Sequence, residues 1–92
     1  FETLLKTIKE DLSWSQSAMF VARATVCGGP PYEPVRRAQW NVTLRNALVY
    51  PGPDTDSLGA EWRYDGCHFS SSGLLQKADM WVDSLQTYIL ND

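Results

Sequence analysis

The chain has 92 residues, of which 43% are hydrophobic and 21% are charged, and its net charge is −3 at pH 7. This length is enough for one hydrophobic core, and the composition is that of a globular domain rather than of a disordered or collagen-like chain. The negative charge argues against nucleic acid as a partner, and no apolar run approaches the roughly 20 residues that span a bilayer. We expect one folded segment, covering residues 1–92.

The first part of the chain predicts a helix followed by a strand. Residues 1–14 place Leu4, Ile8 and Leu12 on one face at steps of four, which indicates an amphipathic helix. This pattern is under way at the first residue, so we expect a segment of a longer or processed product. Residues 19–27 are short, apolar and bounded by Ser-rich and Gly-Pro-rich stretches, which favours a buried strand.

A second helix and a second strand follow. Residues 28–31 read Gly-Gly-Pro-Pro and interrupt regular structure, and Pro34 suits the first turn of a helix that runs to about Arg45. Residues 47–50 predict a short strand, which the sequence Pro-Gly-Pro at 51–53 would end.

The last helix has the strongest pattern. Apolar side chains recur at steps of three and four while polar side chains occupy the opposite face, and one of the serines at 70–72 can cap the helix. The apolar set consists of Leu74, Leu75, Ala78, Trp81, Val82, Leu85, Tyr88 and Ile89.

The order of these elements predicts the α/β class. Parallel strands over residues 19–27 and 47–50, joined by a right-handed crossover and accompanied by three helices, would form a sandwich. Parallel strands normally belong to wider sheets, so we expect either a missing N-terminal portion or self-association to supply more of the sheet.

The single histidine stands in a loop between the second strand and the last helix. His68 follows Asp65 by three residues, with Gly66 between them. Such a turn can bring the carboxylate to Nδ1 of the imidazole and leave Nε2 free to take a proton from a serine hydroxyl. From spacing alone, however, a turn with a capping aspartate is the more frequent arrangement.

Three blocks of the sequence resemble the C-terminal part of SGNH-superfamily (GDSL-like) carbohydrate acetylesterases, the group related to sialate O-acetylesterase. These blocks are Val-Arg-Arg-Ala-Gln at 35–39, Gly-Pro-Asp-Thr-Asp at 52–56, and the stretch from Arg63 to Leu74 that contains Asp-Gly-Cys-His. The resemblance implies a flavodoxin-like sandwich, no cofactor or metal, and Asp65 and His68 as the acid and base of a catalytic triad. Its substrate would be an acetylated carbohydrate or another small ester.

The nucleophile of that family is missing from these residues. No Gly-Asp-Ser or Gly-Gln-Ser turn is present, so the serine must lie outside the chain and the isolated chain should be nearly inert. A rival hypothesis from another class is a non-catalytic α/β module that keeps the esterase scaffold and works by assembly or binding.

Two aromatic residues and two acidic residues have alternative roles. Trp62 and Tyr64 precede the Asp-x-x-His turn and could stack on a sugar, although large aromatic side chains are more often part of the core. Asp54 and Asp56 could hold a hard cation, but a solvated turn is the more frequent arrangement for such a pair.

The two cysteines leave further alternatives open. Cys67 could be a nucleophile beside His68, but neighbouring side chains in a turn usually diverge. Cys27 and Cys67 follow parallel strands at the same end of the sheet, so a disulfide is feasible if their Cα atoms come within about 7 Å. Because neighbouring strands alone do not orient the Cβ atoms correctly, two free thiols are the more frequent outcome.

Overall fold

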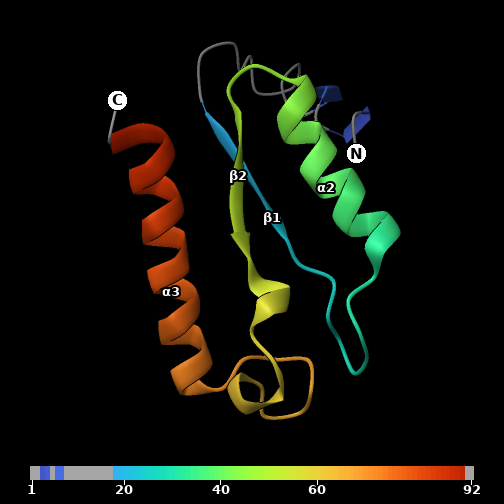
Figure 1. The fold of residues 1–92 in the computed structure, drawn as a ribbon, viewed down its shortest axis with the longest axis vertical. Coiled ribbons are helices and arrows are strands. Elements are labelled where there is room, and N and C mark those ends of the chain that lie inside the picture. Colours follow the sequence, from blue (N-terminus) through green and yellow to red (C-terminus); the bar gives the residue numbers. More distant parts are fainter. Residues whose placement is uncertain (1–2, 5, 8–17, 91–92) are drawn as a thin grey trace.

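The computed structural model describes residues 3–4, 6–7 and 18–90, shown in Figure 1. Two parallel strands and two long helices make up the described part, which confirms the α/β class. They follow the order β1 (Met19–Arg23), α2 (Glu33–Arg45), β2 (Val49–Asp54) and α3 (Ser71–Leu85). Short 3₁₀ turns at Thr55–Ser57 and Ala60–Trp62 separate β2 from α3, and a π-helical turn at Gln86–Leu90 follows α3.

The described residues do not form the flavodoxin-like sandwich with three helices that the resemblance implied. The sheet within residues 18–90 has two strands, and two long helices accompany it. Most of the helix predicted over residues 1–14 lies outside the described residues. The four residues of this range that the structure describes, 3–4 and 6–7, are helical. None of the helices in the described part combines the length and apolar character that crossing a bilayer requires.

The first strand is shorter than the predicted range of 19–27. It spans Met19–Arg23, and the backbone groups of the next residue are bound by a side chain of α2. The side-chain amide of Gln39 accepts from the backbone N–H of Ala24 at 3.1 Å and donates to its carbonyl at 3.4 Å. A glutamine side chain of α2 therefore satisfies both backbone groups of the residue that follows β1.

The second strand extends beyond the predicted range of 47–50 and includes the prolines that were expected to end it. Met19 donates its N–H to the carbonyl of Leu48 at 2.8 Å, and alternate residues of a strand direct their backbone groups to opposite sides. The backbone nitrogen of Pro51 therefore points away from β1, toward the outer edge of the sheet, where no N–H donor is required. A proline is compatible with this outer edge of the sheet, which explains why the strand continues.

The core lies between the sheet and the two helices, which flank the strands from either side in Figure 1. Val21, Val42 and Val49 form its buried cluster, and Val42 of α2 is the most enclosed at 1% exposure. On the α3 side, aromatic rings pack together, with Phe20 5.5 Å from Tyr50 and 6.4 Å from Trp81 between ring centroids. The core is thus small and relies on aromatic contacts on one face.

The apolar stripe of α3 is only partly covered. Trp81 and Tyr88 are half-buried, whereas Leu75 is 71% exposed. Leu74, Val82 and Leu85 are exposed as well. The amphipathic pattern predicted the helix correctly, but these four apolar side chains of the helix remain exposed.

Candidate active site

The candidate site lies in two loops at the carboxyl ends of the parallel strands. One loop follows β1 and the other, which carries Asp65 and His68, follows β2. Ligands of open α/β sheets bind at this end of the strands. A disulfide between Cys27 and Cys67, whose Cα atoms are 4.0 Å apart, joins the two loops. The preference for two free thiols was therefore wrong, because the loops rather than the strands bring the cysteines together.

Asp65 and His68 form a hydrogen bond, which their spacing allows and which the resemblance implied. Oδ2 of Asp65 lies 2.6 Å from Nδ1 of His68, and Oδ1 accepts the backbone N–H groups of Cys67 at 2.9 Å and of His68 at 2.6 Å. Gly66 has a φ of +79°, which a residue without Cβ adopts most easily, and Tyr64 closes the turn by donating its N–H to the carbonyl of His68. One carboxylate therefore holds both the backbone of the turn and the imidazole ring.

The electrostatics of this pair follow from the same contacts. The hydrogen bond from His68, helped by the backbone N–H groups of Cys67 and His68, lowers the pKa of Asp65 from 3.8 to about 2. The carboxylate is therefore ionised at neutral pH. The His68 side chain is 67% exposed, which leaves its Nε2 edge open to solvent or to another molecule.

The two aromatic candidates differ in position. Tyr64 is 72% exposed, and its ring stacks against the imidazole of His68 with 5.8 Å between centroids. Trp62 is half-buried, and its carbonyl accepts the N–H and hydroxyl of Ser70 beneath the start of α3. Only Tyr64 is thus in direct contact with the Asp65–His68 pair.

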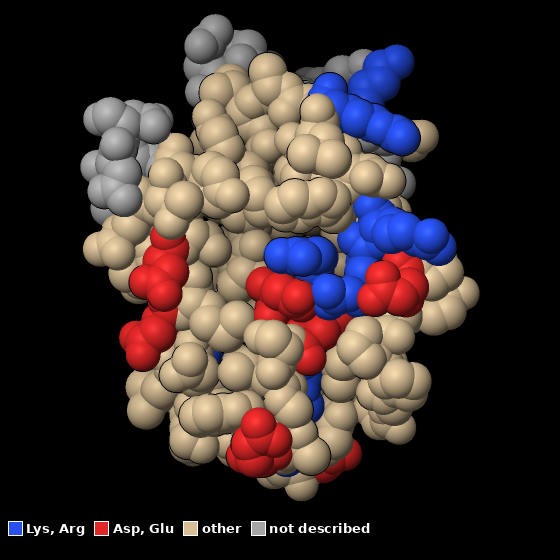
Figure 2. Space-filling view, viewed as in Figure 1, with Lys and Arg blue, Asp and Glu red and all other residues tan. Residues whose placement is uncertain are grey.

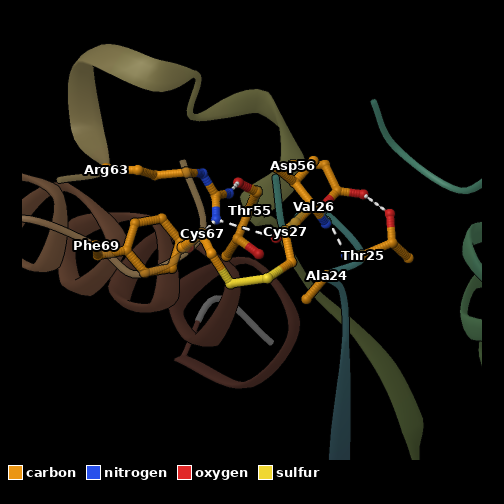
Figure 3. A pocket seen from close by; sticks show the side chains of 9 residues that line it. All are labelled: Ala24, Thr25, Val26, Cys27, Thr55, Asp56, Arg63, Cys67 and Phe69. Carbon is orange, nitrogen blue, oxygen red and sulfur yellow. Dashed lines mark hydrogen bonds between the residues drawn. A yellow bond between two sulfur atoms is a disulfide. The ribbon is translucent and has the colours of Figure 1, made fainter. Parts of the chain in front are cut away.

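Arg63 is the residue of this region whose role sequence analysis missed. It is 9% exposed, and its guanidinium donates to four backbone carbonyls and lies 4.3 Å from the centre of the Phe69 ring. The carbonyls belong to Val26, Thr55, Leu58 and Cys67. The guanidinium and the disulfide line the same cavity of about 300 Å³, shown in Figure 3.

Asp56 is not part of a solvated turn, so that interpretation was wrong. Its side chain is 2% exposed and accepts hydrogen bonds from the backbone N–H and hydroxyl of Thr25, the N–H of Val26 and the guanidinium of Arg36. Burial, the largest single effect, would raise its pKa, but these hydrogen bonds together outweigh it and lower the pKa to about 2. Both oxygens of Asp56 are thus already occupied.

Asp54 shares the same arginine. Arg36 binds both of its oxygens, at 2.7 and 2.9 Å, and this hydrogen bonding lowers the pKa of Asp54 while raising that of Arg36. Figure 2 shows the opposite charges gathered side by side in the middle of one face. Within the described part of the chain, no group of three or more His, Cys, Asp or Glu side chains is arranged to hold a metal ion.

The serines nearest to the histidine have structural contacts. Ser70 caps α3, because its hydroxyl oxygen accepts the N–H of Gly73 at 3.1 Å, as the sequence predicted for one of the serines at 70–72. The same hydroxyl donates to the carbonyl of Trp62 at 3.1 Å. Among the described residues, no serine hydroxyl is hydrogen-bonded to His68.

Neither a scan against protein-family models nor searches of curated proteins and of solved structures found a match to this chain.

Proposed function

We propose that this chain is the C-terminal part of an SGNH-type serine esterase that hydrolyses O-acetyl esters of carbohydrates. Asp65 and His68 would supply the acid and base of the triad. The observation that carries the proposal is the 2.6 Å contact between Oδ2 of Asp65 and Nδ1 of His68, combined with the exposed imidazole edge opposite that contact. A base that must reach a serine on another segment needs this combination of fixed orientation and free Nε2.

The proposed reaction is an acyl transfer. A serine from outside residues 1–92 attacks the acetyl carbonyl while Nε2 of His68 takes the hydroxyl proton, and the same proton then passes to the leaving sugar oxygen. Water, deprotonated by His68 in the same way, then attacks the acetyl-serine and releases acetate, and the proton returns to the serine oxygen. Asp65 stabilises the imidazolium that forms in between. Its low pKa suits this role, because the carboxylate keeps its charge without taking the proton itself.

The position of the pair supports the proposal as well. Both loops of the candidate site follow parallel strands at their carboxyl ends, where α/β enzymes hold their ligands. Backbone groups alternate in direction along a strand, so the N–H and C=O groups of Phe20 and Ala22 point away from β2. The outer edge of β1 is therefore able to pair with another strand. A wider, flavodoxin-like sheet would therefore be built outward from β1, with β2 as its edge.

The carbohydrate part of the proposal rests on the resemblance and on one aromatic side chain. Tyr64 presents an exposed ring beside His68, and such a ring can stack on the face of a sugar. Trp62 could contribute a second ring, but it is half-buried under α3 and is the weaker of the two substrate-binding candidates.

A non-catalytic assembly module is the second candidate function. The exposed apolar side chains Leu74, Leu75, Val82 and Leu85 of α3 favour it, because contiguous apolar surface on a soluble domain usually marks an interaction site. The open edge of β1 could equally serve pairing with a second copy of the chain.

The coding sequence upstream of Phe1 separates the two candidates at little cost. An in-frame Gly-Asp-Ser or Gly-Gln-Ser block would support the esterase. A reading frame that starts near Phe1 would favour the assembly module. The direct test is an activity assay of the chain joined to that upstream portion, in which His68→Ala should abolish turnover of acetyl esters.

A further inference from the structure

Cys67, the residue immediately before His68, is held by three different groups. Its N–H donates to Oδ1 of Asp65 at 2.9 Å, its carbonyl accepts from Arg63 at 2.7 Å, and its sulfur is bonded to Cys27. Since consecutive residues share a peptide plane, fixing both backbone groups of Cys67 fixes where the backbone of His68 begins. The orientation of the imidazole thus depends also on two contacts of Cys67, with Arg63 and with Cys27, that neither Asp65 nor His68 makes.

Arg63 is the group among these that joins the most distant parts of the site. Its Nε donates to Leu58 at 2.9 Å, and its terminal nitrogens donate to Thr55 at 2.9 Å and to Cys67 at 2.7 Å. A longer contact of 3.4 Å reaches the carbonyl of Val26 in the loop after β1. One side chain therefore joins the Asp65–His68 turn to the start of its own loop, at Thr55 and Leu58, and to the loop after β1.

This set of contacts requires an arginine. A guanidinium presents five N–H donors in a rigid plane, whereas a lysine ammonium has three donors on a compact head and cannot reach carbonyls on opposite sides. The Phe69 ring lies against the guanidinium and fixes its plane further. The contacts that hold Arg63 are thus specific for the shape of this side chain as well as for its charge.

We infer that Arg63 is the positioning residue of the Asp65–His68 pair, acting through the carbonyl of Cys67. Its importance for catalysis rests on the proposed esterase function, because a fixed imidazole matters only if Nε2 has a proton to transfer. The positioning itself is a property of this chain alone. A displacement of about 1 Å at a catalytic group can lower the rate roughly 100-fold. Weakening the hydrogen bonds of Arg63 should therefore have a measurable effect on the rate.

The test uses the imidazole of His68 as a reporter in the isolated chain. Because the sequence contains one histidine, its ¹⁵N and ring-proton NMR signals need no assignment by mutation. In the wild type we expect the Nδ1–H form, with the proton of the Asp65–His68 hydrogen bond far downfield. Arg63→Lys, which keeps the charge, should lose that downfield proton and give a mixture of the two ring tautomers.

Two further variants make the result interpretable. Arg37→Ala removes an exposed arginine of α2 and should leave the His68 signals unchanged. Phe69→Leu removes the ring against the guanidinium while keeping Arg63, so it reports on the same clamp if Arg63→Lys fails to fold, and it should weaken the downfield signal. Folded Arg63→Lys or Phe69→Leu protein with wild-type His68 signals would overturn the inference.

An assay of the joined esterase separates this inference from the proposed function. If wild-type protein turns over acetyl esters, Arg63→Lys should lower kcat by roughly 10- to 100-fold with little change in KM. Changed His68 signals in a variant, together with no turnover by wild-type protein, would support the positioning role and contradict the esterase. An unchanged kcat in folded Arg63→Lys protein would contradict the positioning role alone.

Discussion

Oδ2 of Asp65 lies 2.6 Å from Nδ1 of His68, while the other oxygen of the same carboxylate accepts the backbone N–H groups of Cys67 and His68. The aspartate is thus both the cap of its own turn and the partner of the imidazole. These two roles are compatible, since the cap fixes the backbone from which the ring projects. Experiments must therefore separate a capping aspartate that happens to touch a histidine from one that prepares a catalytic base.

The pKa of Asp65 reports directly on its bond to the imidazole. The carboxyl has a pKa of about 2, and the largest cause is the hydrogen bond from His68. In His68→Ala protein this pKa should rise toward 3.8 but stop short of it, because the backbone N–H of Cys67 still donates to Oδ1. A pH titration of the ¹³C carboxyl signal measures the change. An unchanged pKa in the variant would show that the imidazole ring does not lower the pKa of Asp65.

Asp56 should make the fold sensitive to acid. Its pKa is about 2 in the folded chain against 3.8 ordinarily, so its stabilisation is fully present well above pH 3.8 and is lost as the pH falls through 2. The shift corresponds to about 2 kcal/mol of unfolding free energy. Chemical denaturation of wild type and of Asp56→Asn is measured at pH 7 and at pH 2.5. The variant should have the lower unfolding free energy at pH 7, and its unfolding free energy should change less between the two pH values. Asp79→Asn on the exposed face of α3 is the control.

Gly73 should resist substitution although it lies within a helix. Alanine usually stabilises a helix interior by about 1 kcal/mol relative to glycine. At this position, however, a Cβ would overlap the carbonyl oxygen of Trp62, which is backbone and cannot rotate away. We therefore expect Gly73→Ala to lower the unfolding free energy by roughly 1–3 kcal/mol, whereas Ser71→Ala, exposed in the same turn, should not. Stabilisation by Gly73→Ala would show that α3 does not pack on Trp62 in this way.

Local sequence patterns predicted the parts of the fold that depend on neighbouring residues. The helix expected from Pro34 to about Arg45 spans Glu33–Arg45, and the cap expected among the serines at 70–72 is Ser70. The contact between Asp65 and His68, which their spacing allows, is equally local, since they are three positions apart. Each of these features is decided within a few residues of the chain, where proline, serine and glycine have direct effects on the backbone.

Several features that depend on distant residues were missed or judged the less frequent alternative, although the parallel pairing of the two strands was predicted. Asp56 reads as part of a solvated turn because its partner Thr25 lies 31 positions away and becomes visible only when β1 and β2 pair. The disulfide has the same origin, with 40 positions between its cysteines. Arg63 was missed for a different reason: three of its four carbonyl partners lie within eight positions, but every residue has a backbone carbonyl, so such partners leave no pattern in the sequence. The buried position of Arg63 and its set of four carbonyls become visible only in the folded loops.

The assembly hypothesis makes a separate prediction about oligomeric state. If the exposed stripe of α3 is an interface, wild-type chain should self-associate as its concentration rises, and Leu75→Lys should favour the monomer. Leu75 is 71% exposed, so the substitution should have little effect on folding. Analytical ultracentrifugation measures both proteins, with Asp79→Asn at an exposed position of α3 as a control that raises the net charge by the same amount. A compact wild-type monomer at high concentration would contradict assembly through this stripe.

The measurement that tests the esterase proposal most directly is a paired assay on an activated acetyl ester, comparing the isolated chain with the chain joined to the upstream portion. We predict that the isolated chain does no better than free imidazole and that the joined protein turns over the ester. In the joined protein, His68→Ala should abolish this activity. Asp65→Asn should lower it by roughly 10⁴-fold, as the same substitution does in serine proteases with a Ser-His-Asp triad. Turnover by the isolated chain that depends on His68, or turnover by the joined protein that survives His68→Ala, would contradict the proposal.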